Sequence, residues 1–264
     1  MTQRTETILD RIVAHKRDEL AAARNAVPMD NLKARLAEAP PTRSFSYAIR
    51  RDTISLIAEV KKASPSRGIL RADFEPVSLA QTYARSAAAA ISVLTDERHF
   101  QGSLQHLASI RQQLSDGPPL LRKDFLFDEY QLYEARCHGA DAVLLITAIL
   151  ETSPLAELIQ QAKSLDMDAL VEVHDESELE RATEASADLI AINNRDLRTF
   201  EIDLATTERL APLAPPGATV VAESGVFRRA DVTRLAACNV HAVLIGEALV
   251  TATDPGAKIG ELFA

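Results

Sequence analysis

Residues 139–146 read GADAVLLI, and two later stretches have the same form, SADLIAIN at 186–193 and NVHAVLIG at 239–246. Each one places a small or polar residue at the end of a predicted helix, directly before a short apolar run typical of a buried strand. The three stretches begin 47 and 53 residues apart. Two strand–helix units of about 25 residues therefore fit each interval, which predicts an α/β fold built from repeated units.

Eight apolar runs follow residue 53, and segments with helical periodicity separate them. The runs lie at 54–60, 90–95, 119–123, 141–146, 168–173, 188–192, 219–222 and 242–246. The segments with helical periodicity lie at 77–86, 103–114, 128–138, 153–164, 176–184, 204–211 and 229–237. Strands that alternate with helices in this way predict parallel βαβ units.

The number of units favours a closed barrel over an open sheet. Eight strand–helix units over about 210 residues are typical of a (β/α)8 TIM barrel. The alternative is a doubly wound sheet, which more often has about five to seven strands and a glycine-rich turn after its first strand. No GxGxxG motif occurs after residue 60, so we predict the barrel.

The residues before the first strand predict an N-terminal helical extension. Residues 5–24 carry apolar side chains at helical spacing among charged ones, with Thr5 as a candidate N-cap. A second helix is predicted at 29–38, where two prolines end it. We expect one barrel domain over residues 1–264, of which residues 1–45 form the extension.

The composition argues against nucleic-acid and membrane partners. Of the 264 residues, 47% are hydrophobic and 25% are charged, and the net charge is −9, whereas nucleic-acid binders usually present a basic face. No apolar run approaches the length of about 18 residues that a membrane span needs, and the charged N-terminus has no signal-peptide core. We expect a cytoplasmic protein that is a monomer or a weak homo-oligomer.

No spacing indicates a metal site or a nucleotide cofactor. Cys137 and Cys238 do not form a CxxC pair, and no HxH or HExxH motif occurs. Four histidines occur in unrelated contexts and are not predicted to form a site: His99, His138, His174 and His241. The missing GxGxxG motif also argues against a nicotinamide, so we expect no metal and no cofactor.

Polar side chains end several predicted strands on the face that points into the barrel. Side chains alternate along a strand, and the site of such a barrel lies at the C-terminal strand ends. In SLIAEVKKASPSRG (55–68), Glu59 and Lys61 share the face of Ile57. By the same parity the later strands end inward with Lys123 and Phe125, Glu172, Asn193, Glu223 and Gly246. Burial of so many unpaired polar groups would cost several kcal/mol each, so their convergence predicts a polar site.

Each of these residues taken alone also fits a structural role. Glu59 with Lys61 could be a structural ion pair, and Lys123 could pair with a neighbouring carboxylate. Lys62, Arg122 and Asp124 have outward parity, and we expect them at the solvated surface.

The last two predicted strands end in glycines, which indicates a phosphate site. Gly225 follows the strand at 219–222, and Gly246 precedes a helix predicted to begin near Glu247. The loops after these two strands, together with a helix N-terminus, are the usual phosphate site of such barrels. Ser64 could add a hydroxyl. The alternative is that both glycines serve only as turn residues.

Apolar side chains lie at or near the ends of the second to fourth predicted strands: Phe100, Phe125, Leu144 and Ile146. Beside the lysines they favour a substrate with an anionic end and a planar apolar ring, although ordinary packing explains each of them equally well.

Eight segments of the chain resemble the indole-3-glycerol-phosphate synthase family. They are IAEVKKASPSRG (57–68), SVLTDERHFQGS (92–103), LLRKDF (120–125), GADAVLLI (139–146), LVEVHD (170–175), INNRDL (192–197), VAESGV (221–226) and LIGEAL (244–249). The chain stops just past the eighth strand, so the resemblance is to the monofunctional form, without a fused isomerase barrel. The resemblance implies a cofactor-free carboxy-lyase of tryptophan biosynthesis, acting on the phosphorylated substrate 1-(2-carboxyphenylamino)-1-deoxyribulose 5-phosphate. The products would be indole-3-glycerol phosphate, CO2 and water.

The resemblance also implies a role for individual residues. Lys123 would be the general acid of ring closure, Lys61 the acid of dehydration, and Glu59 the base of that later step. Glu172 would position the reacting groups and tune Lys123. The remaining residues are implied to complete the site or bind substrate: Asn193, Ser224 and Glu223 as polar groups, Arg195 at the substrate carboxylate, Ser64, Gly225 and Gly246 at the phosphate, and Phe100, Phe125, Leu144 and Leu244 around the ring.

Two positions depart from the family pattern, and two other functions compete with the one implied. Arg67 stands where many members have lysine, and Glu247 where some have serine, which leaves the phosphate contacts less defined than the acid–base groups.

A phosphoribosylanthranilate isomerase barrel would need only one acid and one base. A non-catalytic barrel that binds phosphorylated ligands would need the glycines but not Lys123.

Overall fold

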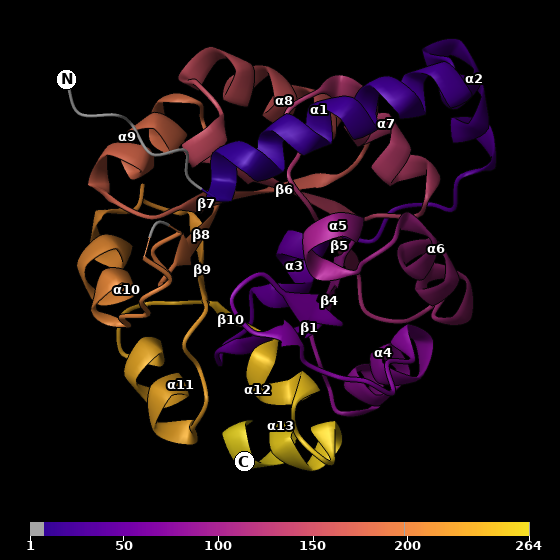
Figure 1. Cartoon of the computed structure of the whole chain (residues 1–264). Coiled ribbons are helices and arrows are strands. Elements are labelled where there is room, and N and C mark those ends of the chain that lie inside the picture. The colour runs from indigo at the N-terminus through magenta and orange to yellow at the C-terminus, as the bar shows by residue number, and fades with distance from the viewer. Residues whose placement is uncertain (1–7, 198, 264) are drawn as a thin grey trace.

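Eight parallel strands close into a barrel, as the alternating pattern predicts. The computed structural model describes residues 8–197 and 199–263. The strands are β1 (Ser55–Val60), β4 (Ala90–Leu94), β5 (Leu120–Lys123), β6 (Ala142–Ile146), β7 (Asp168–Val173), β8 (Leu189–Asn193), β9 (Thr219–Glu223) and β10 (Ala242–Ile245). They pair in chain order, and β10 pairs with β1 to close the sheet (Figure 1). The predicted TIM barrel is confirmed.

The seven predicted helical segments are all helices, and they surround the barrel (Figure 1). They are α4 (Pro76–Arg85), α6 (Leu104–Gln113), α7 (Glu129–Cys137), α8 (Thr152–Ser164), α9 (Glu176–Glu184), α10 (Ala205–Leu210) and α11 (Arg229–Ala236). Aspartates that precede two of them, Asp128 and Asp175, accept hydrogen bonds from backbone N–H groups of the first turn, as N-caps do.

Shorter elements occupy the loops at the C-terminal ends of the strands. A hairpin of β2 (Ala63–Ser64) and β3 (Gly68–Ile69) follows β1, and α5 (Glu97–Phe100) follows β4. The 3₁₀ turn η2 (Thr147–Ile149) follows β6, whereas η3 (Ala211–Leu213) follows α10 and precedes the N-terminal end of β9. The helix predicted near Glu247 is α12 (Glu247–Val250), and α13 (Pro255–Phe263) ends the described chain.

Alternation along the strands separates an inner core from an outer one. Ile57, Leu121 and Leu170 belong to a cluster inside the barrel, while their sequence neighbours pack outward against the helices. Helix α3 (Phe45–Ile49) supplies Phe45 and Ile49, both fully buried, to the inner cluster. Ser46 of this helix bonds to Asp168 at the start of β7, so α3 closes the N-terminal end of the barrel.

Asp141, directly before β6, anchors the chain that leads to α3. Its carboxylate lies 2.7 Å from the backbone N and from Nη2 of Arg43, 3.0 Å from Nη1 of Arg111, and 2.7 Å from the backbone N of Leu120. The carboxylate is buried, so these bonds replace the water that it loses.

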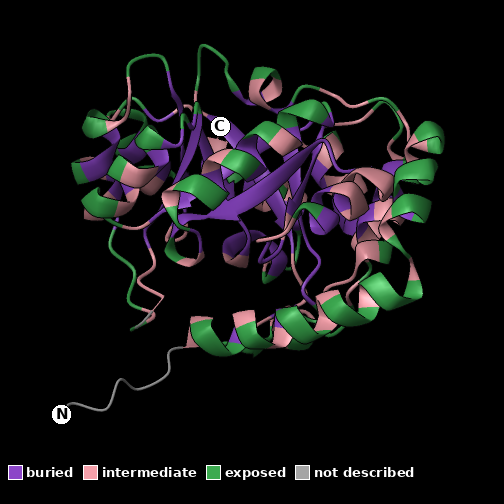
Figure 2. Cartoon of the chain, turned by 90° about the horizontal axis from the view of Figure 1, so that it is seen from above, coloured by how far each residue is buried: buried purple, intermediate pink, exposed green. Residues whose placement is uncertain are grey.

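The extension consists of α1 (Ile8–Ala26), α2 (Met29–Arg35) and the 3₁₀ turn η1 (Leu36–Glu38). Both predicted helices are present, while the N-cap predicted at Thr5 lies outside the described residues. Figure 2 shows α1 running along one end of the molecule, with its exposed face outward. Its buried side chain Ile12 belongs to the inner cluster. Within the described residues no helix has both the length and the apolarity needed to cross a membrane.

Candidate active site

A single cavity at the C-terminal end of the strands brings the predicted site residues together. Its lining includes all fifteen of them. From the strands and their loops come Glu59, Lys61, Ser64, Phe100, Lys123, Phe125, Leu144, Glu172, Asn193, Arg195, Glu223, Ser224, Gly225, Leu244 and Gly246. The inward parity that the sequence predicts for the strand ends is therefore correct, while the role of each residue stays a prediction.

Glu59 and Lys61 form an ion pair at the end of β1. Lys61 Nζ lies 2.5 Å from Glu59 Oε2, and both side chains are largely buried. Gly246, after β10, lies against this pair. A Cβ at Gly246 would collide with the Glu59 carboxylate and come within 2.9 Å of Lys61 Nζ. The absence of a side chain at Gly246 therefore leaves the space that the carboxylate and the ammonium occupy.

Lys123 lies between two carboxylates at the centre of the site. Its Nζ is 3.0 Å from Glu172 Oε2 and 3.1 Å from both carboxylate oxygens of Glu223. Burial opposes the charge of Lys123, but Glu172, Glu223 and Glu59 outweigh it and hold the pKa of the ammonium above its usual value. Lys123 is thus a charged acid at neutral pH.

The two carboxylates that bind Lys123 have pKa values shifted in opposite directions. Burial raises the pKa of Glu223 to about 8, and the charge of Glu172 adds to the shift, although Lys123 opposes it. Burial also opposes ionisation of Glu172, but Lys123 and His174 outweigh it and hold its pKa well below the usual value. The two carboxyl groups therefore titrate as a coupled pair, in which ionisation is favoured at Glu172 and opposed at Glu223.

His174 does not line the cavity, but it contacts Glu172, which does. Its Nε2 lies 3.3 Å from Glu172 Oε1, and its Nδ1 lies 2.9 Å from Glu178 Oε2. Burial disfavours the charged ring, but the carboxylates of Glu172 and Glu178 outweigh it and raise the pKa of His174 to about 10. From the sequence the histidines are considered only as a possible shared site, and this contact with Glu172 is not predicted. Side-chain alternation could have predicted this contact, because His174 follows Glu172 by two residues and faces the same way.

Asn193 and Arg195 shape the cavity after β8. The side-chain oxygen of Asn193 accepts a hydrogen bond of 3.0 Å from the backbone N of Arg195. The Arg195 guanidinium donates to the carbonyl of Phe200 at 3.3 Å and lies 3.7 Å from Glu247. The guanidinium lines the cavity, where it can meet an anionic group.

The loop after β9 has a strained backbone next to the cavity. Ser224 adopts φ = 68°, a conformation that is rare outside glycine, and Gly225 follows with φ = 88°. A Cβ at Gly225 would approach Ile202 Cγ2 to 2.6 Å, so this position needs glycine both for its conformation and for space. The left-handed pair turns the chain sharply beside the cavity.

Several features of the cavity suit a phosphate group. Ser64 Oγ is buried and has no hydrogen-bond partner in the described structure, so it is free to bind a ligand. Gly246 leads into α12, and Gly225 lies in the neighbouring loop. At the same place Glu247 forms an ion pair of 2.9 Å with Arg67, so the two positions that depart from the family pattern contact each other.

Apolar side chains form part of the cavity wall. The rings of Phe100 and Phe125 lie with centroids 6.2 Å apart, and Leu144 is buried beside the cavity. Ile8, Leu9 and Ile12 of α1 complete the lining, which the strand pattern does not reveal.

Arg122 and Asp124 are not surface residues, which corrects the sequence analysis. Both are buried, and Arg122 Nη2 lies 3.2 Å from Asp124 Oδ2. Arg122 also pairs with Glu134 of α7 at 2.9 Å, and Asp124 pairs with Lys16 of α1 at 3.0 Å. Arg122 is covered by α7, while Asp124 follows the end of β5, lines the cavity and is paired with Lys16 of α1. Lys62 is partly exposed.

Comparison with known proteins identifies the family. The family model described as indole-3-glycerol phosphate synthase matches residues 9–262, which is nearly the whole chain. The chain belongs to the indole-3-glycerol phosphate synthase family. The resemblance drawn from the eight sequence segments is thereby confirmed.

Relatives named indole-3-glycerol phosphate synthase match the chain along its length. The protein of Dehalococcoides mccartyi (strain CBDB1) is 50% identical over 257 residues, covering 97% of this chain and 99% of its own. Those of Roseiflexus sp. (strain RS-1) and Burkholderia vietnamiensis (strain G4 / LMG 22486) are 51% and 48% identical, each covering 97% of this chain and 98% of its own.

Two solved structures share the barrel. A 3-hexulose-6-phosphate synthase superposes with a TM-score of 0.61 at 18% identity, covering 79% of this chain and 98% of its own. The Salmonella typhimurium enzyme of that name gives 0.65 at 14% identity, covering 79% and 96%. At such identities the likeness supports the fold alone.

Proposed function

We propose that the chain catalyses the reaction for which its family is named. In this reaction 1-(2-carboxyphenylamino)-1-deoxyribulose 5-phosphate closes to indole-3-glycerol phosphate and releases CO2 and water. The observation that carries the proposal is the charged Lys123, held between Glu172 and Glu223 in the same cavity as the Glu59–Lys61 pair. The site thus offers two acids, Lys123 and Lys61, each paired with at least one carboxylate.

Lys123 is assigned the first proton transfer. The ring carbon that bears the carboxylate attacks the substrate ketone, and Lys123 gives a proton to the ketone oxygen, which becomes a hydroxyl. CO2 then leaves, and its bonding electrons restore the aromatic ring. The lone pair of the substrate nitrogen drives the attack, so these residues supply only proton transfer and positioning. A positioned general acid accelerates such a step by about 10²–10⁴-fold.

The Glu59–Lys61 pair is assigned the dehydration. The hydroxyl made in the first step takes a proton from Lys61 and leaves as water, while Glu59 removes a proton from the new ring. The two groups lie 2.5 Å apart, so one can hand a proton to the other between steps. Asn193 and Ser224 line the same cavity and are assigned to hold the substrate hydroxyls.

The remaining lining residues orient the substrate. Ser64, Gly225 and Gly246 are assigned to the phosphate, since one offers an unpaired hydroxyl and the others allow close backbone approach. Arg195 is assigned to the substrate carboxylate. The apolar wall is assigned to the aromatic ring, and its members are Phe100, Phe125, Leu144 and Leu244. We further propose that the chain works in the cytoplasm as a monomer or weak homo-oligomer, without a cofactor.

Indole fluorescence tests this function directly. The chain contains no tryptophan, so a new indole signal on adding the carboxyphenylamino-deoxyribulose phosphate reports product without a tryptophan background from the protein. No signal at high enzyme concentration would refute the proposal. Phosphoribosylanthranilate is the matched control, because conversion of that compound in place of the first would instead indicate an isomerase barrel.

A further inference from the structure

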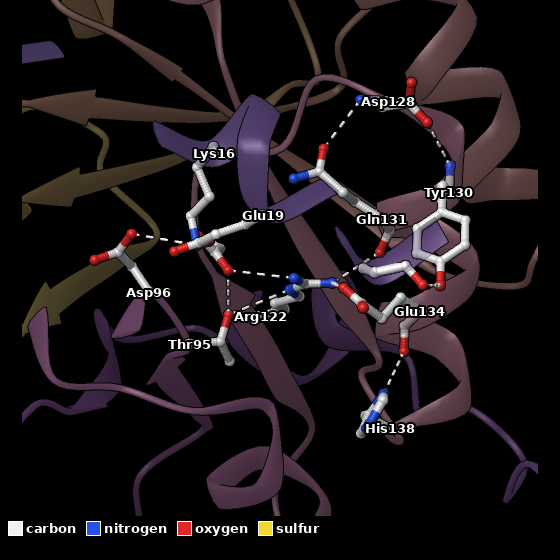
Figure 3. A network of polar contacts seen from close by, with 12 residues as sticks. Lys16, Glu19, Thr95, Asp96, Arg122, Asp128, Tyr130, Gln131, Glu134 and His138 are labelled. Atoms are coloured by element: carbon white, nitrogen blue, oxygen red, sulfur yellow. Dashed lines mark hydrogen bonds and ion pairs between the residues drawn. The ribbon is translucent and has the colours of Figure 1, made fainter. Parts of the chain in front are cut away.

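One lysine of the N-terminal helix is buried among carboxylates at the edge of the site. Lys16 Nζ lies 3.0 Å from Asp124 Oδ1, 3.2 Å from Asp96 Oδ2 and 2.6 Å from Glu19 Oε2, and only 5% of its side chain is exposed. Figure 3 shows Lys16 reaching from α1 toward Asp96, with Thr95 and Arg122 close by. The roles proposed above leave this cluster unused.

The Asp124 carboxylate fixes the end of the strand that carries Lys123. Asp124 stands between Lys123 and Phe125, and its Oδ1 accepts the backbone N–H of Phe125 at 2.9 Å. Its Oδ2 accepts from Thr95 Oγ1 at 2.6 Å and from Arg122 at 3.2 Å. Lys16 thus joins α1 to the backbone that places the general acid and one ring of the apolar wall.

The Asp96 carboxylate holds the segment that carries Phe100, the other phenylalanine of the apolar wall. Asp96 Oδ1 caps α5 by accepting the backbone N–H groups of His99 at 2.7 Å and Phe100 at 3.2 Å. Its Oδ2 is buried and makes no hydrogen bond in the described structure, so Lys16 alone balances its charge there. Holding Asp96 therefore also holds α5 and the Phe100 ring.

The same helix supplies the apolar cover of the cavity. Ile12 lies one turn before Lys16, so both side chains lie on one face of α1. Both are buried, and Ile12 lines the cavity together with Ile8 and Leu9. The position of Ile12 over the ring wall therefore depends on where Lys16 holds the helix.

The charge of this lysine persists over the working pH range. Burial opposes the charged form, but Asp124 and Asp96 outweigh it and hold the pKa of Lys16 above its usual value. A buried ion pair contributes little net stability compared with apolar packing of the same volume, but it selects one geometry. The cluster is therefore better suited to placing α1 than to stabilising the fold.

We propose that Lys16 is a positioning residue for the reaction, which joins α1 to Asp96 and Asp124 and so assembles the pocket for the aromatic ring. The inference rests on the proposed function. It adds that the two phenylalanines and Ile12 take their places only when one ammonium bridges all three segments.

The test compares Lys16→Met with a matched break elsewhere on α1. Methionine keeps the length and the helix propensity but removes the charge. The control is Arg24→Met, which removes an exposed pair of 2.7 Å between the same helix and Asp128. We expect KM to rise about tenfold in Lys16→Met, the effect of losing one aliphatic contact with the ring, while Arg24→Met keeps wild-type constants.

A double variant separates positioning from stability. Lys16→Met leaves two buried carboxylates facing each other, so Lys16→Met/Asp96→Asn removes one charge while asparagine still caps α5. We expect the double variant to recover the midpoint of urea unfolding but to keep the raised KM and to show faster amide exchange across α1. Wild-type KM and exchange in the folded double variant would overturn the inference. An inactive wild-type enzyme would instead overturn the proposed function.

Discussion

Gly246→Ala is expected to disturb the Glu59–Lys61 pair without removing any functional group. The backbone of Gly246 has φ = −115° and ψ = −68°, so the position does not require the left-handed conformation that favours glycine. The added methyl group would collide with Glu59 Oε2 and lie 2.9 Å from Lys61 Nζ. The carboxylate oxygen must retreat by about 1 Å to regain van der Waals separation.

This displacement predicts a large loss of activity with a small loss of stability. A misplacement of about 1 Å at reacting groups costs about 10²-fold in rate, so we expect kcat to fall by about that factor. The atoms that must move belong to the ends of flexible side chains, so the free energy of unfolding should drop by only about 1 kcal/mol. The indole fluorescence assay measures kcat, and urea unfolding measures the free energy of unfolding.

Gly260→Ala is the matched control for this variant. Gly260 lies exposed in α13, and a Cβ there meets no atom within 4 Å. Its substitution should leave kcat unchanged and raise stability by about 0.5–1 kcal/mol, because alanine favours the helix. The reasoning would be refuted if Gly246→Ala kept a kcat within about threefold of wild type. It would also be refuted if that variant unfolded, because the backbone rather than the acid–base pair would then depend on the glycine.

Other predictions address single residues. Lys123→Ala should fold and lose at least about 10²-fold in turnover, and a near-normal rate in the fluorescence assay would assign the first acid elsewhere. Glu223 has a pKa raised from 4.5 to about 8, so the native state holds a proton that the unfolded state has lost, and stability falls as pH rises through this window. Glu223→Gln should remove that part of the decline in the free energy of unfolding, measured with urea between pH 5 and 8.5. An unchanged dependence of this free energy on pH would contradict the assignment. Asp141→Asn should cost about 3–5 kcal/mol in unfolding free energy by leaving Arg43 and Arg111 without their buried counter-charge, yet leave KM near wild type.

The strand pattern was sufficient to predict the barrel and the face on which the site lies. Apolar runs bounded by polar residues locate each strand to within about two residues, because a buried strand must be apolar along its length. Alternation then assigns Glu59, Lys123 and Glu223 to the inside, since backbone geometry alone sets that parity. The identity of the family followed from motifs around the same strand ends.

The burial of charges was not predictable in this way. Parity assigns Arg122 and Asp124 to the outside of the barrel, and the surface is where such charged residues usually lie. They are buried because Glu134 of α7 pairs with Arg122 and Lys16 of α1 pairs with Asp124. No local sequence pattern shows which residue, distant in the chain, will pack against Arg122 and Asp124. The prediction that both lie at the solvated surface was therefore wrong.

His174, which contacts Glu172 beside the cavity, shows the same limit. Its sequence neighbours place it on the inward face, but only the fold shows that it lies 3.3 Å from Glu172. The sequence alone determined the strands, their inward faces and the family, because these depend on local periodicity and on motifs. The tertiary structure alone decided which charges are buried, how a proton is shared between Glu172 and Glu223, and how α1 is held. Each of these depends on the distance between groups far apart in the chain and on the removal of water around them.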